Sequence, residues 1–147
     1  MRYSDMAATT APRSSRALAA ALTTGIVALT LATGAIHLSL GGMLFTLNAL
    51  GYFALAAAYV FAAAVTHPLV VRFGWLPRVA LIGYAVASIV AWLVIGGFYS
   101  LGYITKAVEL ALIILLIVDI YRVYGGVAGL ARHAAASLRW TVAWIRH

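Results

Sequence analysis

Four long apolar stretches most constrain what this chain can fold into. They cover residues 17–40, 45–66, 77–98 and 103–124. Each reaches the roughly 20 residues that a helix needs to cross the hydrocarbon core of a bilayer. The short connections between them favour antiparallel neighbours. The sequence therefore predicts an all-α fold, a transmembrane four-helix bundle over residues 17–124.

The composition supports this prediction and excludes other classes of protein. Hydrophobic residues make up 65% of the chain and charged residues 9%, against about 45–50% and about 25% in soluble domains. A soluble monomer is therefore excluded. The chain has no cysteine, which excludes disulfides and thiolate metal sites. Its basic residues lie at the ends of apolar runs and form no basic polar surface, so nucleic acid is not an expected partner.

The basic residues also predict the orientation in the membrane. Nine of the ten fall on one side of the four predicted spans, and Lys106 alone falls on the other. The nine are Arg2, Arg13, Arg16, Arg72, Arg78, Arg122, Arg132, Arg139 and Arg146. Because cytoplasmic loops carry the excess of Lys and Arg, we expect both termini in the cytoplasm. The expected location is the cytoplasmic membrane of a prokaryote, as a multi-pass protein.

The N-terminal segment allows two interpretations. Residues 1–16 are rich in Ser, Thr and Ala, and we expect them to be a disordered cytoplasmic segment. Arg13 and Arg16 precede an apolar run, as in a signal peptide. That run is longer than the 7 to 15 residues typical of a signal core, which favours a retained first span.

The C-terminal segment, residues 125–147, is predicted to be a cytoplasmic amphipathic tail. Its arginines Arg132, Arg139 and Arg146 are spaced by seven, nearly two helical turns, so they share one face. Apolar residues occupy another face, and Trp140 and Trp144 suit the depth of lipid head groups. An interfacial helix on anionic lipid and a helix docked on a partner subunit both fit this pattern.

Ionisable residues inside predicted spans are the candidates for function, because they are costly in a bilayer. The topology places His37, Asn48, Lys106 and Glu109 at a similar depth near the extracytoplasmic face, with Tyr52 beside them. This set is a candidate pocket for a polar ligand or a proton. In the alternative interpretation, Lys106 and Glu109 are a neutralising pair at i,i+3, and His37 and Asn48 join helices by hydrogen bonds.

A second charged pair lies at the other end of the last span. Asp119 and Arg122 are three residues apart, and we expect an ion pair at the membrane interface. Glu109 and Asp119 are separated by ten residues, or about 15 Å along a helix. They are therefore too far apart to form a close carboxylate pair.

No cofactor, metal or catalytic residue is predicted. His37 and His67 lie near opposite faces of the bilayer, so they are too far apart to ligate one haem iron. No two His or acidic residues fall at i,i+3 or i,i+4 within one helix, as a helical metal motif requires. The nucleotide-binding and nucleophile motifs are absent. We therefore do not expect an enzyme.

Three short segments suggest a family. They are Ala35-Ile36-His37-Leu38, Leu47-Asn48-Ala49-Leu50-Gly51-Tyr52 and Gly102-Tyr103-Ile104-Thr105-Lys106-Ala107-Val108-Glu109. Together they resemble small four-span membrane proteins of prokaryotes, a group without an established activity. The resemblance covers the four spans and not the tail, and it implies no activity, cofactor or substrate.

Two functions are compatible with these features. The first is a non-enzymatic accessory or interaction subunit of a membrane assembly, in contact with lipid, other subunits or further copies of itself. Its basis is the small mass outside the membrane and the amphipathic tail. The second is a small transporter or ligand-binding membrane protein that uses the pocket around His37 and Glu109. The second is favoured if Glu109 points toward His37 and not toward lipid.

Overall fold

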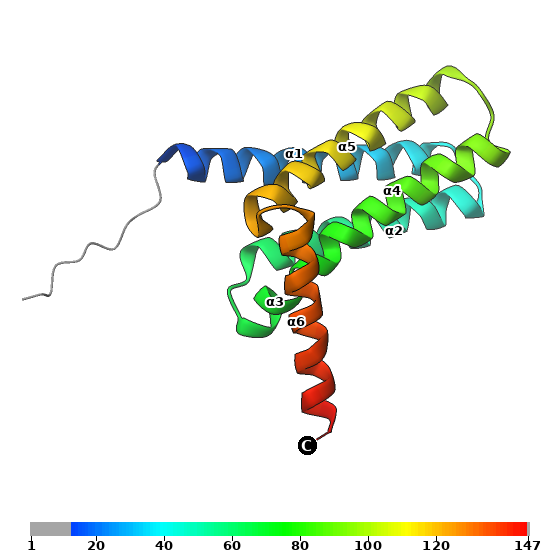
Figure 1. The fold of residues 1–147 in the computed structure, drawn as a ribbon. Coiled ribbons are helices and arrows are strands. Elements are labelled where there is room, and N and C mark those ends of the chain that lie inside the picture. The colour runs from blue at the N-terminus through cyan, green and yellow to red at the C-terminus, as the bar shows by residue number, and fades with distance from the viewer. Residues whose placement is uncertain (1–12, 147) are drawn as a thin grey trace, which may run out of the picture.

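The computed structural model describes residues 13–146, and the regular structure of this part of the chain is helical throughout. The helices are α1 (Arg13–Ser39), α2 (Met43–Ala64), α3 (Pro68–Phe73), α4 (Trp75–Ile95), α5 (Ser100–Tyr124) and α6 (Val127–Ile145). Helices α1, α2, α4 and α5 form the bundle, and α6 runs across one end of it (Figure 1). The predicted all-α, four-helix fold is confirmed.

The packing order of the bundle places two helices on opposite corners. Helix α1 packs against α2 and α5, and α4 packs against the same two helices. The turn between α1 and α2 contains Gly41 and Gly42 at φ +69° and +82°, a left-handed region in which glycine is favoured. This tight turn makes α1 and α2 the predicted antiparallel hairpin.

The two ends of the bundle differ in what they carry. The hairpin end contains the turns at residues 40–42 and 96–99 and the starts of α2 and α5. The α6 end contains α3, α6 and the start of α4 (Figure 1). On the predicted orientation, the hairpin end faces outward and the α6 end faces the cytoplasm.

The outer surface of the bundle fits a hydrocarbon environment. Four candidate spans meet the length and hydropathy of membrane-crossing helices: Ser15–Ser39, Met43–Ala64, Pro68–Ile95 and Ser100–Tyr124. Large apolar side chains such as Leu50, Val94 and Ile114 are more than half exposed on the bundle surface. Lipid covers such side chains at no cost. The chain is therefore a small multi-pass membrane protein.

The middle of the bundle is closed by apolar packing. Ile26, Leu81, Leu112 and Leu116 are fully buried there and form one cluster with two buried tyrosines. Residues from α1, α4 and α5 thus meet at the bundle axis. This apolar layer separates the polar groups of the hairpin end from those of the α6 end.

The connection before the third span and the start of the first span are both more helical than a loop. The connection between the second and third predicted spans contains α3. Its start is stabilised because the His67 Nδ1 accepts a hydrogen bond from the Leu69 N–H at 3.3 Å, and because Pro68 occupies the first helical turn, where proline is favoured. Residues 13–16, expected to be disordered, form the first turn of α1, which arginine tolerates well. Residues 1–12 lie outside the described part of the chain.

Candidate functional site

All four helices of the bundle contribute to a buried polar cluster at the hairpin end. The hairpin-end cluster consists of His37 from α1, Tyr52 from α2, Ser88 from α4, and Lys106 and Glu109 from α5. The Glu109 side chain is fully buried and forms its centre. A carboxylate in such a place is stable only if its charge is paired and hydrogen-bonded.

Both carboxylate oxygens of Glu109 have partners. Oε1 accepts hydrogen bonds from the Tyr52 hydroxyl at 3.0 Å and the Ser88 hydroxyl at 2.8 Å. Oε2 accepts from the Lys106 ammonium at 2.6 Å. Lys106 also donates to Ser88 Oγ at 2.8 Å. An ammonium has three N–H donors, so Lys106 has one left after Glu109 and Ser88.

The imidazole of His37 approaches this network from the side. Its Nδ1 lies 2.8 Å from the backbone oxygen of Thr33, and because a carbonyl only accepts, Nδ1 carries the proton. Nε2 therefore faces the cluster, 3.5 Å from Ser88 Oγ and 3.9 Å from Glu109 Oε1. The neutral ring presents a hydrogen-bond acceptor here, and the protonated ring would present a second donor.

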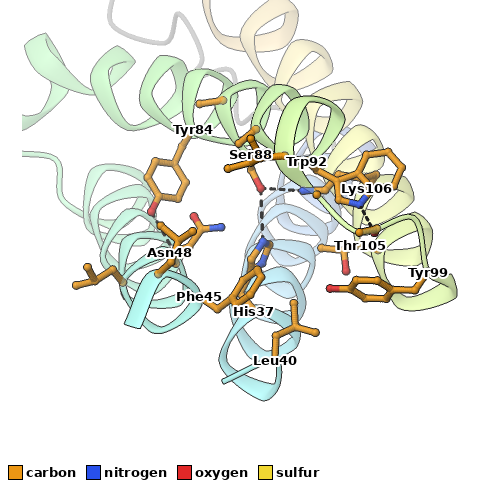
Figure 2. A pocket seen from close by; sticks show the side chains of 18 residues that line it. His37, Leu40, Phe45, Asn48, Tyr84, Ser88, Trp92, Tyr99, Thr105 and Lys106 are labelled. Atoms are coloured by element: carbon orange, nitrogen blue, oxygen red, sulfur yellow. Dashed lines mark hydrogen bonds between the residues drawn. The ribbon is translucent and has the colours of Figure 1, made fainter. Parts of the chain in front are cut away.

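A cavity of about 400 Å³ opens beside the hairpin-end cluster. Lys106, His37 and Ser88 form its polar wall, with Ser88 lying between the other two (Figure 2). Asn48 and Tyr99 also line it. Glu109 does not line the cavity, so the charged group closest to a bound molecule is the Lys106 ammonium.

The remaining wall of the cavity is mostly apolar, and its apolar side chains come from α2, α4 and the turn between α1 and α2. It includes Leu40, Leu44, Phe45, Ala91, Trp92 and Ile95. The Trp92 indole N–H donates to the Gly97 carbonyl at 3.1 Å, which fixes the ring beside the turn. Ligand sites commonly have this size and an apolar wall with few polar groups.

Glycines allow two aromatic side chains of the cavity to take their places. A Cβ at Gly51 would collide with the hydroxyl of Tyr84, which donates to the Asn48 backbone oxygen at 3.2 Å. A Cβ at Gly102 would stand 2.8 Å from the Trp92 Nε1 atom. Both glycines therefore preserve the shape of the wall.

A second buried cluster lies on the other side of the apolar layer. This α6-end cluster consists of Asp119, Arg78, Arg122 and Tyr59. Asp119 is fully buried, and its Oδ2 accepts from Arg78 Nε at 2.8 Å and the Tyr59 hydroxyl at 3.1 Å. Its Oδ1 accepts from Arg122 at 2.7 Å.

The expected ion pair between Asp119 and Arg122 is present, and the structure adds partners that the sequence did not predict. Asp119 does pair with Arg122, but it also joins α5 to α2 and α4 inside the bundle. Arg78 reaches it because its guanidinium also donates to the Gly74 carbonyl at 2.6 Å, which orients it inward. Neither the cavity beside the hairpin-end cluster nor a recess between α3 and α6 has a residue of the α6-end cluster in its wall.

The sequence-predicted pocket residues converge in part. His37, Asn48 and Lys106 line the cavity, and Tyr52 and Glu109 lie directly behind its polar wall. The Asn48 side chain lines the cavity, while its backbone oxygen accepts from Tyr84. Ser88 is not among the predicted pocket residues, although it contacts Lys106, Glu109 and His37. The signal for it in the sequence is the four-residue spacing of the polar side chains Tyr84, Ser88 and Trp92.

The charges limit the chemistry of the hairpin-end cluster. Ser88 Oγ lies 2.8 Å from the Lys106 Nζ, and a lysine activates a serine only when the amine is neutral. Here Lys106 pairs with the Glu109 carboxylate at 2.6 Å, and an adjacent negative charge favours the ammonium form, which has no lone pair to accept the serine proton. The geometry suits hydrogen bonding to a bound molecule. Within residues 13–146, no group of three His or acidic residues is placed to hold a metal ion.

Comparisons with protein-family models, with curated proteins and with solved structures found no match for this chain. The resemblance to small four-span proteins of prokaryotes stays a prediction from the sequence. The class that the fold defines is a small multi-pass membrane protein with a buried charged cluster beside a cavity.

Proposed function

We propose that this membrane protein binds a small amphiphile in the cavity at its hairpin end. The observation that carries the proposal is the Lys106–Glu109 pair at 2.6 Å, which side chains from the other three helices surround and whose lysine lines a cavity of about 400 Å³. Burying such a pair brings little net stability. A binding role explains why the charge is placed beside open space.

The available hydrogen-bonding groups define the head group of the ligand. Lys106 has one N–H donor left, and the Asn48 amide offers further donors. Glu109, the strongest acceptor in the region, is occupied and lies behind the wall. We therefore infer a head group that accepts hydrogen bonds, such as a carboxylate or a carbonyl. The apolar part of the ligand would lie against Leu44, Trp92 and Ile95.

Binding is better supported than transport. The apolar layer of fully buried residues between the two clusters, including Leu81 and Leu116, closes the bundle axis. A ligand entering from the hairpin end would stop at the hairpin-end cluster. The accessory-subunit role expected from the sequence stays a prediction.

The proposal is tested with three ten-carbon amphiphiles, each carrying a photoactivatable diazirine on the chain: decanoic acid, decanol and decylamine. The full chain is placed in nanodiscs of phosphatidylcholine, irradiated and mapped by peptide mass spectrometry. Decanoic acid is expected to label the cavity residues Leu44, Trp92 or Ile95, and the amine is expected to label them least, because Lys106 repels it. Equal labelling by all three probes, or labelling spread evenly over lipid-facing residues, would overturn the proposal.

The matched variants are Lys106→Met and Arg122→Met. Each removes one cation from a carboxylate three residues away on α5. Lys106→Met is expected to lower labelling by decanoic acid about tenfold or more, because a hydrogen bond to a charged group contributes about 1.5–3 kcal/mol. Arg122→Met leaves the cavity wall intact and should leave the labelling unchanged.

A further inference from the structure

Helix α6 has a defined place relative to the bundle. It packs on α3, where the His133 Nε2–H and the Ser137 hydroxyl both donate to the Arg72 carbonyl, at 3.1 and 2.8 Å. The Arg72 guanidinium lies 4.4 Å above the Trp140 ring. These contacts hold α6 crosswise to the spans (Figure 1), so its axis runs along the membrane surface when the bundle crosses the bilayer.

Away from α3, the surface of α6 has two further faces. Leu138, Val142 and Ile145 are spaced by four and three residues and are 48–70% exposed, so they form an apolar stripe. Arg132 and Arg139 are spaced by seven and form a second exposed stripe. The two stripes are neighbours on the helix, and both are uncovered within the described structure.

The charge of this region has no counterpart within the described residues. Residues 13–146 contain two carboxylates, Glu109 and Asp119, and both are fully buried and paired with other cations. No described carboxylate lies within ion-pair distance of Arg72, Arg132 or Arg139. A surface with this excess positive charge attracts anions from outside the chain.

The groove between α3 and α6 adds a recess to this surface that has an arginine and a histidine in a partly apolar wall. Thr66, Arg72 and His133 are among the residues that line it. A phosphate oxygen is a strong acceptor for an arginine side chain. Basic recesses of this kind beside spanning helices suit the head groups of anionic lipids.

We propose that α6 lies on the surface of an anionic phospholipid leaflet, with its apolar stripe in the acyl boundary and its arginines on lipid phosphates. A leaflet offers hydrocarbon and negative charge in the same plane, side by side, as the two stripes require. This orientation needs no second protein to cover the apolar stripe. The inference is independent of the ligand proposed for the hairpin-end cavity.

The test measures the depth of single labels on α6. The chain has no native cysteine, so Val142→Cys or Ala143→Cys carries the only nitroxide. Val142 lies on the apolar stripe, whereas Ala143 lies on the arginine side, four residues from Arg139 and three from Arg146. The full chain is reconstituted in nanodiscs of phosphatidylcholine, with or without phosphatidylglycerol. Accessibility to oxygen, which partitions into lipid, is compared with accessibility to a water-soluble nickel chelate.

The proposal predicts that the Val142→Cys label is severalfold more accessible to oxygen than to nickel when phosphatidylglycerol is present, and that the Ala143→Cys label shows the reverse. The double substitution Arg132→Gln with Arg139→Gln, or added salt, should reduce the difference between the two lipid mixtures. Nickel access at Val142→Cys equal to that at Ala143→Cys would place α6 in water and overturn the proposal. Shielding of Val142→Cys from both reagents would overturn it in favour of a protein partner or a second copy.

Discussion

Helix α5 carries two buried carboxylates in nearly equivalent surroundings, and only one of them, Glu109, has partners that line a cavity. Glu109 and Asp119 each pair with a cation three residues away and accept a hydrogen bond from a tyrosine of α2, Tyr52 or Tyr59. The difference lies on α4. Glu109 meets the small Ser88, which leaves open space, whereas Asp119 meets the long Arg78, which fills the space with a second cation.

This comparison separates a binding site from a structural contact. At the α6-end cluster, two arginines and a tyrosine occupy the carboxylate of Asp119, and none of these residues lines either of the two cavities described above. At the hairpin-end cluster, Lys106 retains an unused donor that borders a cavity. A carboxylate with a cation three residues away is therefore not sufficient to indicate a binding site. The residue on the facing helix α4 determines whether a cavity remains beside the pair.

The largest expected effect comes from breaking the α6-end cluster. Asp119→Asn leaves Arg78 buried without a carboxylate, and removal of one partner of a buried ion pair costs about 3–5 kcal/mol. We expect the free energy of unfolding, measured by denaturant titration in micelles, to fall by this amount. Labelling of the cavity by the decanoic acid probe should persist at temperatures where the variant remains folded.

The equivalent change at the hairpin end should cost less. In Glu109→Gln the amide keeps one acceptor for Tyr52 and Ser88, and the Lys106 ammonium borders the cavity, where water can hydrate it. We expect a loss of about 1–3 kcal/mol in the same unfolding measurement. A loss as large as that of Asp119→Asn would contradict the distinction between the two clusters.

The smallest effects are expected from the two tyrosines. Tyr52→Phe and Tyr59→Phe each remove one hydrogen bond to a buried carboxylate, at 3.0 and 3.1 Å, which is worth about 0.6–1.5 kcal/mol inside a membrane bundle. Similar losses of stability are expected for both. Only Tyr52→Phe should weaken labelling by the decanoic acid probe, because Tyr52 supports the wall of the cavity. Equal loss of labelling in the two variants would show that the probe reports stability and not the site.

The depth of the site could be predicted from the sequence, but the direction of each side chain could not. The turn between residues 40 and 44 and the short turn before residue 100 bring His37, Asn48 and Lys106 to one level whatever the rotation of the helices. Ser88 could not be assigned to the hairpin-end cluster from the sequence, because serine is common in apolar helices. Its hydroxyl reaches Glu109 only because of how α4 packs against α5. Rotation of a helix is set by its neighbours.

Arg78 shows a second reason why the direction of a side chain could not be predicted from the sequence. Its position near the end of a span fits the positive-inside pattern, so the sequence gives it a role in topology. In the structure the Arg78 side chain points into the bundle. Helix α4 begins one turn earlier, at Trp75, so the carbonyl of Gly74 accepts a hydrogen bond from the Arg78 guanidinium. Arg78 can therefore both contribute to the positive-inside pattern and pair with a buried carboxylate. The periodicity of the sequence does not distinguish these two roles.

The most direct test of the central claim compares three consecutive positions on α2. Asn48 lines the cavity, Ala49 is fully buried in the bundle, and Leu50 is 55% exposed on the outer surface. Single cysteines at these positions, in a chain that has none of its own, are treated in nanodiscs with a small water-soluble thiol reagent. The account predicts that Asn48→Cys reacts fastest and that decanoic acid slows this reaction alone. Equal rates at the three positions, or no protection by decanoic acid, would contradict it.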